Sequence, residues 1–125
     1  MKRIYLSHPY GGNEANRAKA ACLAKFYRDI WEAEGKDWEL VNPLEELENM
    51  KGVDDETALF AAVALMNSCD SILFADGWKK SRGCRYEHYI ARANGKELAE
   101  IPAEAERIAV HWYGKHRMVV KRIAA

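Results

Sequence analysis

Residues 69–97 read CDSILFADGWKKSRGCRYEHYIARANGKE. The segment opens with a short apolar run at 71–75, passes through a loop of small and polar residues, and then carries a helical pattern that Gly95 closes. An apolar run without alternation is typical of a strand that is buried on both faces, as in the middle of a parallel sheet. We therefore predict a strand at 71–75 and a helix at 82–94, with Ser81 as the N-cap of that helix.

Similar strand and helix patterns flank this segment on both sides. The predicted elements are strands at 3–7, 38–41, 71–75 and 97–101 and helices at 14–34, 54–69 and 82–94. Asn13 suits the start of the first helix, and Gly35 suits its end. Alternating strands and helices predict one α/β domain over residues 1–125, built on an open, mostly parallel, Rossmann-like sheet with helices on both faces.

Two segments fit this pattern less well. Residues 44–53 are polar and acidic, and we expect an irregular surface connection there. Residues 102–125 form a C-terminal extension in which 108–123 alternate between apolar and polar, with a possible turn at 113–116. The alternation favours strand structure, and a helix over 103–113 is the competing interpretation.

The composition excludes several classes of protein. The chain has 125 residues, 49% of them apolar, and a formal net charge of zero, which argues against nucleic acid as a partner and against a membrane-binding field. It has no apolar run long enough to span a membrane. Its three cysteines form no CxxC pair, which favours free thiols in the cytoplasm, and its histidines and cysteines show no metal-ligand spacing.

Charge is nevertheless distributed unevenly along the chain. Residues 29–56 are rich in acids, and residues 107–122 hold five Lys and Arg without an acid. The basic tail could contact phosphate or nucleic acid, dock on the acidic surface of a second subunit, or be a solvated edge element.

In an open parallel sheet, ligands bind beyond the carboxyl ends of the strands, which here selects the loops after the first and third strands. The candidate substrate-binding residues are Ser7, His8, Gly11, Asn42, Asp76, Ser81 and Gly83. Ser81 and Gly83 resemble an anion site, because the free N–H groups of a helix start attract phosphate and glycine lets a ligand approach the backbone. A plain serine cap with a permissive glycine is the alternative. His8 beside Pro9 could instead be structural, and Asn42 could cap a turn.

Glu87 lies six residues after Ser81 and would face the same cleft. A carboxylate there could act as a nucleophile toward an electrophilic sugar carbon. The alternative is a solvent-facing residue paired with Arg85 or Arg92. Tyr5, near the end of the first strand, could orient this carboxylate or could simply fill the core.

Cys84 begins the helix after Ser81. Its place at a helix start favours a small packing residue, although the positive end of a helix dipole could also lower the pKa of its thiol.

Three motifs carry a resemblance to a known family: IYLSHPYGG at 4–12 followed by Asn16, VNP at 41–43, and the quoted segment at 69–97. Over about residues 1–100 the chain resembles the nucleoside 2-deoxyribosyltransferase-like superfamily, and within it a small branch found in phages and bacteria. The resemblance implies a flavodoxin-like fold with a parallel five-stranded sheet, a homodimer or larger homo-oligomer, and no cofactor or metal.

The resemblance also implies a chemistry. Enzymes of this superfamily cleave the N-glycosidic bond of 2′-deoxynucleosides or of their 5′-monophosphates. Glu87 matches the nucleophile that attacks C1′, and Tyr5 matches the tyrosine that orients it. Ser81 matches the serine with which nucleotide hydrolases hold a 5′-phosphate, which favours a monophosphate as substrate.

Two positions depart from the family pattern. Ala62 stands near the place of an aspartate that helps to protonate the leaving base, with Asp54 and Asp55 as the nearest acids. His8 stands where a glycine is common, which would put a side chain into the pocket floor. The alternative function is therefore a nucleotide-binding or sequestering module without turnover, for example in a conflict between phage and host. A third is an interaction protein that uses its basic tail.

Overall fold

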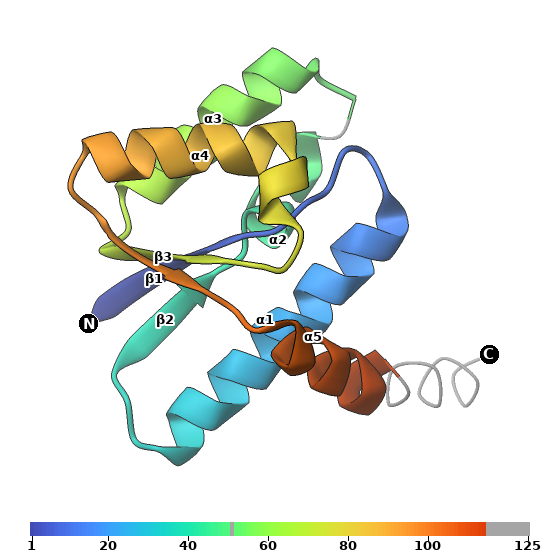
Figure 1. Cartoon of the computed structure of the whole chain (residues 1–125), viewed down its shortest axis with the longest axis vertical. Coiled ribbons are helices and arrows are strands. Elements are labelled where there is room, and N and C mark those ends of the chain that lie inside the picture. Colours follow the sequence, from blue (N-terminus) through green and yellow to red (C-terminus); the bar gives the residue numbers. More distant parts are fainter. Residues whose placement is uncertain (51, 115–125) are drawn as a thin grey trace.

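The computed structural model describes residues 1–50 and 52–114, and it shows a parallel sheet with helices on both faces (Figure 1). The strands are β1 (Lys2–Ser7), β2 (Trp38–Val41), β3 (Ser71–Phe74) and β4 (Glu97–Glu100), in the order β2-β1-β3-β4. This arrangement confirms the predicted open α/β class. The described residues form four strands, where the family resemblance implied five.

The main helices are α1 (Glu14–Ala33), α3 (Asp55–Asn67), α4 (Arg82–Ala93) and α5 (Ala103–Ala109). Figure 1 shows α3 and α4 on one face of the sheet and α1 and α5 on the other. None of the helices in the described part of the chain is long and apolar enough to cross a membrane.

The predicted helix boundaries are confirmed by their caps. The Asn13 side chain accepts hydrogen bonds from two backbone N–H groups at the start of α1, and the Ser81 side chain accepts one at the start of α4. Gly35 and Gly95 follow the ends of α1 and α4 with positive φ, a conformation that glycine adopts without the cost of a Cβ.

The side chains of β1 alternate between two core layers. Ile4 and Leu6 pack in the layer that includes α1, whereas Tyr5 packs with Val41 and Ile72 in the layer under α3 and α4. Because successive side chains of a strand point to opposite faces, Ser7 shares the face of Tyr5. This alternation decides which helix each residue at the end of β1 can reach.

Residues 44–53 are more regular than expected. The chain forms α2 (Pro43–Glu46) and a 3₁₀ turn (Glu48–Met50), so the irregular connection predicted there is wrong for most of its length. Asn42 caps α2, and Pro43 occupies its first turn, where the missing N–H costs nothing.

The segment after α5 continues as a π-helical turn (Val110–Gly114). The competing helix prediction is thus confirmed, and the strand prediction is wrong for 108–114; residues 115–125, including part of the predicted turn, lie outside the described residues. The alternation of apolar side chains predicted a strand with one buried face, but two of these side chains, Ile108 and Trp112, are 47% and 68% exposed. The contact with the α1 layer is made by Ala109, Val110 and Tyr113, which follow helical spacing.

Candidate functional site

The loops that follow β1 and β3 meet at the carboxyl edge of the sheet. Ser7 is in register with Phe74, and the Ala75 amide donates a hydrogen bond to the Ser7 carbonyl over 2.9 Å. Further out, a Cβ added to Gly77 would lie 3.9 Å from Cγ of Pro9. The predicted convergence of the two loops is therefore confirmed.

Glu87 lies in the second turn of α4 and points at the sheet. It is only 6% exposed. The Tyr5 hydroxyl donates a hydrogen bond to Oε2 of Glu87, and the Ser7 hydroxyl donates one to Oε1 over 3.0 Å. The alternative of a solvent-facing glutamate paired with an arginine is wrong, and the expected contact between Tyr5 and Glu87 is present.

Ser7 was predicted to contact the substrate, but in the structure its hydroxyl contacts Glu87. It is fully buried, and its hydroxyl is a partner of Glu87, not a group exposed for substrate. Both oxygens of the carboxylate thus accept a hydrogen bond from a neutral hydroxyl. Tyr5 and Ser7 are two residues apart on β1, so the strand repeat itself puts both hydroxyls on the face that α4 covers.

Burial raises the pKa of Glu87 from 4.5 to about 7, while the hydrogen bonds from Tyr5 and Ser7 act in the opposite direction and offset only part of the rise. Burial and the nearby Glu87 carboxylate both raise the pKa of the Tyr5 hydroxyl well above its ordinary value, so it remains a donor. Within the described residues, no Lys, Arg or His forms an ion pair with Glu87. The site holds a carboxylate that is poised to gain or lose its proton near neutral pH.

The start of α4 is partly open. The Ser81 side chain accepts a hydrogen bond from the Cys84 amide over 3.3 Å, and its carbonyl accepts one from the Arg85 amide over 3.0 Å. The first free N–H groups of the helix, those of Arg82 and Gly83, have no hydrogen-bond partner among the described residues. A Cβ added to Gly83 would meet nothing within 4 Å, so an anion has room to approach these amides.

Cys84 sits between this helix start and Ser7. Burial raises the pKa of its thiol, and hydrogen bonds with Ser7 and Ser81 lower it by less. The prediction of a small packing residue fits its 2% exposure. The alternative of a thiol activated by the helix dipole is wrong, because desolvation outweighs the effect of the helix start.

His8 does not enter the pocket floor, because it directly follows Ser7 at the end of β1 and its side chain turns to the opposite face of the sheet. Its ring is almost completely buried, its Nδ1–H donates a hydrogen bond to the Pro9 carbonyl over 2.8 Å, and its Nε2 contacts the carboxylate of Glu106 in α5. Both ring nitrogens thus face acceptor oxygens. The predicted ligand contact for His8 is replaced by a link between the β1 loop and α5.

Glu106 was not among the residues predicted from the sequence for the site. A signal for the orientation of His8 was available, since alternation from Tyr5 and Ser7 assigns His8 to the face of Leu6. Nothing comparable identified Glu106, because it lies in a segment for which strand and helix patterns competed.

The remaining predicted residues lie around the site. Asn42 is 1% exposed and caps α2 through its Oδ1, which accepts from the Leu44 amide over 3.1 Å, while its Nδ2 has no partner among the described residues. A buried donor without a partner is costly and is a candidate contact for a ligand oxygen. Gly11 and Asp76 are exposed in their loops, and neither has a hydrogen bond to the Glu87 cluster.

A hollow of about 430 Å³ lies beside the site, against β4. Trp78 and His88 stack in its lining with ring centroids 4.4 Å apart, and the Trp78 indole N–H donates to Glu100 over 2.7 Å. Glu87 does not line this hollow. The part of the chain that the structure describes contains no group of three or more His, Cys, Asp or Glu arranged to hold a metal ion.

A family model matches residues 2–100 and is described as a domain of unknown function, DUF4406. The chain belongs to the DUF4406 family. Among curated proteins and among solved structures, no match is found. The DUF4406 region contains all four strands, Tyr5, Ser7, Ser81 and Glu87, but it ends before α5 and Glu106. The carboxylate site thus lies within the matched region, and the link from His8 to Glu106 reaches outside it.

Proposed function

We propose that the protein cleaves the N-glycosidic bond of 2′-deoxynucleoside 5′-monophosphates, by hydrolysis or by deoxyribosyl transfer, with Glu87 as the nucleophile. The observation that carries the proposal is the buried Glu87 carboxylate, held by the hydroxyls of Tyr5 and Ser7 one turn and a half behind an open helix start. A core position would not retain a carboxylate without a cation unless the group served a purpose, because burial penalises the charged form.

Each element of the site has a task in this reaction. The free amides of Arg82 and Gly83 would bind the 5′-phosphate, with Ser81 beside them. Tyr5 and Ser7 would fix the Glu87 carboxylate in one orientation, which lowers the entropic cost of attack. Asn42 would offer its unpaired Nδ2 to an oxygen of the substrate.

The proposed reaction has two displacements. In the first, an Oε of ionised Glu87 forms a bond with C1′ while the C1′–N bond breaks, and the base leaves with the electron pair and takes up a proton. In the second, water or another base attacks C1′, the ester bond to Glu87 breaks, and the carboxylate is restored. The pKa of about 7 leaves a large fraction of Glu87 ionised at neutral pH.

Protonation of the leaving base is the step for which the described residues offer no acidic side chain at the expected position. Ala62 is on α3 where an acid would be expected, and the Asp54 carboxylate is engaged in capping α3, where it accepts from the Thr57 amide over 2.7 Å. The proposal therefore assigns this proton to solvent, and it favours nucleotides whose bases leave readily.

The direct test is to incubate the protein with a panel of 2′-deoxynucleoside 5′-monophosphates and to measure free base by chromatography. The Glu87→Ala variant is the control for the nucleophile, and Ser81→Ala tests the phosphate assignment. Release of base by the wild type and not by Glu87→Ala supports the proposal. Absence of free base with every nucleotide overturns it, and an unchanged KM for monophosphates in Ser81→Ala removes the phosphate assignment.

The missing acid favours a second candidate function, a module that binds nucleotides without turning them over. Ala62 in place of an acid is the observation behind it. The same panel separates the two functions, because this candidate predicts measurable nucleotide binding by calorimetry and no free base. The third candidate is a contact of the basic tail with nucleic acid or another subunit. In this tail Arg107 forms an ion pair with Glu104 over 3.3 Å, and Lys115, Arg117, Lys121 and Arg122 lie outside the described residues.

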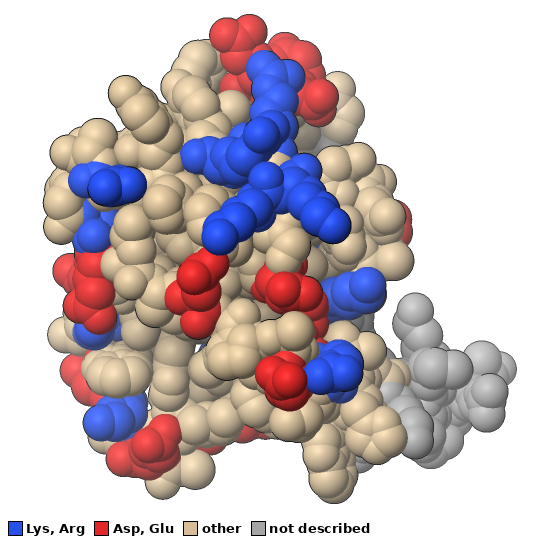
Figure 2. All heavy atoms as spheres, in the orientation of Figure 1, with Lys and Arg blue, Asp and Glu red and all other residues tan. Residues whose placement is uncertain are grey.

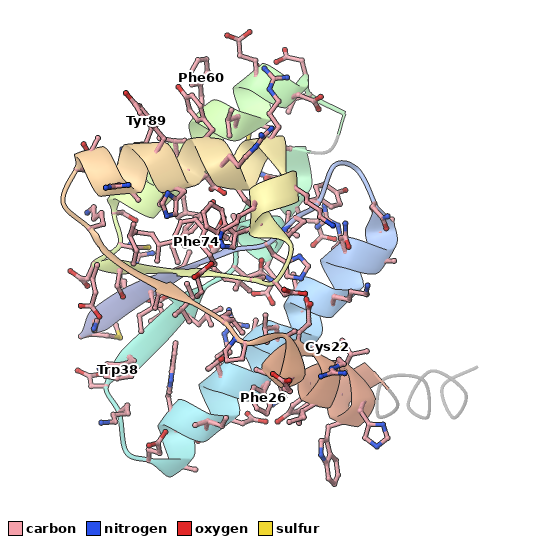
Figure 3. All side chains as sticks on the ribbon, viewed as in Figure 1. Cys22, Phe26, Trp38, Phe60, Phe74 and Tyr89 are labelled. Carbon is pink, nitrogen blue, oxygen red and sulfur yellow. The ribbon has the colours of Figure 1, made fainter. Side chains whose placement is uncertain are left out.

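We also propose that the protein forms a homodimer or larger homo-oligomer. Support comes from α3 and α4, where Phe60 and Tyr89 project away from the sheet and are 59% and 74% exposed (Figure 3). In α3, which is rich in apolar residues, only Met66 is buried, whereas a helix that is apolar all round is normally covered. Sedimentation over a range of concentrations tests this, and a monomer at every concentration contradicts it.

A further inference from the structure

A group of four cations surrounds the start of α4. Lys79 and Lys80 lie in the 3₁₀ turn Trp78–Lys80, and Arg82 and Arg85 lie in the first turns of α4; all four are exposed. Figure 2 shows Lys and Arg side chains gathered on this face, over the region where Figure 1 places the start of α4. We call these four residues the cationic patch.

The cationic patch is not neutralised by the described residues. None of its members forms an ion pair with another described residue, and this holds for Asp76 and Glu87, the acids that flank the patch in sequence. Lys79 contacts the Trp78 ring, 5.7 Å from its centroid, which also leaves its charge uncompensated. Four like charges within seven residues repel one another, and they do so beside the positive end of a helix.

This charge exceeds what one phosphate requires. The proposed seat of the 5′-phosphate is the pair of free amides at Arg82 and Gly83, which needs no side-chain cation. The lysines precede that seat in the chain, and Arg85 follows Arg82 by three residues, so that both arginines lie on the same side of the helix. The patch therefore offers positive charge beyond what a single phosphate at the amides would use.

We infer that the cationic patch holds the outer phosphates of a nucleoside 5′-di- or triphosphate, so that the site accepts these nucleotides as well as monophosphates and binds them more tightly. The inference rests on the proposed function, since it takes the helix start as the 5′-phosphate seat. A small polyphosphate fits better than a nucleic acid, because the patch is confined to one turn and one helix start in a chain of zero net charge.

The experiment measures binding by calorimetry in the Glu87→Gln background, in which the ligand is not consumed. The probes are dAMP, dADP and dATP, with the deoxycytidine series beside them. We expect dATP to bind about tenfold or more tightly than dAMP. In the double variant Lys80→Ala/Arg85→Ala, we expect binding of dATP to weaken at least about tenfold and binding of dAMP to change less than about threefold.

Arg92→Ala is the matched control, since it removes one positive charge from an exposed residue at the other end of α4. The inference is overturned if mono- and triphosphates bind equally tightly, or if Arg92→Ala weakens the binding of dATP as much as the double variant does. It is also overturned if a single-stranded oligonucleotide binds more tightly than dATP. The proposed function has its own readout, the release of base by the wild type. If the wild type releases base but binds mono- and triphosphates equally, only the role of the cationic patch is refuted. If it binds triphosphates more tightly but releases no base, only the proposed glycosidase activity is refuted.

Discussion

Two glutamates near the carboxyl edge of the sheet lie on opposite faces and have different partners: Glu87 is buried, and Glu106 is partly buried. Glu87 lies on the α4 side, where, among the described residues, its carboxylate accepts hydrogen bonds only from the neutral hydroxyls of Tyr5 and Ser7. Glu106 lies on the α5 side, where its carboxylate meets the ring of His8. Ser7 and His8 are neighbours in sequence, so the strand alternation of β1 separates the two sites.

The partners decide what each carboxylate can do. The carboxylate of Glu106 has the ring of His8 as a partner, and this contact links the β1 loop to α5. Burial raises the pKa of Glu87 to about 7, because the hydrogen bonds from the neutral hydroxyls of Tyr5 and Ser7 lower it by too little to offset the desolvation. A carboxylate that is kept under this electrostatic cost suggests chemistry, whereas one that is paired suggests structure.

The largest effect is expected for Glu87→Gln. Loss of the nucleophile should reduce release of base from deoxynucleotides by at least about a thousandfold, measured in the same chromatographic assay. The amide keeps the shape of the side chain, and both hydroxyls can rotate to suit it. Residual activity near that of the wild type would contradict the assignment of Glu87.

The same variant should also stabilise the protein at high pH. The folded protein retains the Glu87 proton between pH 4.5 and about 7 while the unfolded chain has lost it, so stability falls as pH rises through this range. The full cost above pH 7 is about 3 kcal/mol of unfolding free energy. Urea unfolding at pH 5 and pH 8 should show that Glu87→Gln gains stability over the wild type mainly at pH 8.

Glu106→Gln is the matched control, and we expect it to destabilise the protein where Glu87→Gln stabilises it. It replaces a charge-assisted contact with His8 by a weaker one, and we expect a loss of about 1–3 kcal/mol in urea unfolding at neutral pH. Release of base should change little, because the residue is on the other face of the sheet. Destabilisation by Glu87→Gln together with stabilisation by Glu106→Gln would reverse the comparison and refute it.

The difference between the two sites also explains how far the sequence could lead. Apolar runs and caps predicted all four strands and the start of α4, because these features depend on neighbours in the chain. The position of Tyr5 on its strand left two alternatives, a contact with Glu87, 82 residues away, or a place in the core, and only the resemblance of the motifs to a known family favoured the contact. The link between His8 and Glu106, 98 residues apart, had no such motif, and its partner lay in a segment whose spacing was ambiguous.

Tyr5→Phe should change how the activity depends on pH. The hydrogen bond from Tyr5 lowers the pKa of Glu87, so its removal raises that pKa further and moves the acid limb of kcat/KM to higher pH. At pH 7 the activity should fall about tenfold. A uniform fall at every pH would instead indicate that the hydroxyl acts on the substrate and not through Glu87.

Ser7→Ala should shift the same limb in the same direction by less, because Ser7 is the weaker of the two influences that lower the pKa of Glu87. We expect kcat/KM to fall roughly threefold at pH 6.5 and to recover at pH 9, where Glu87 is ionised in either protein. Ser7→Thr keeps the hydroxyl and should restore the limb. Ser71→Ala, at a buried serine near the other end of the sheet, should leave the limb in place. If Ser7→Ala lowers activity equally at both pH values, Ser7 contributes through packing, and the carboxylate is then oriented by Tyr5 alone.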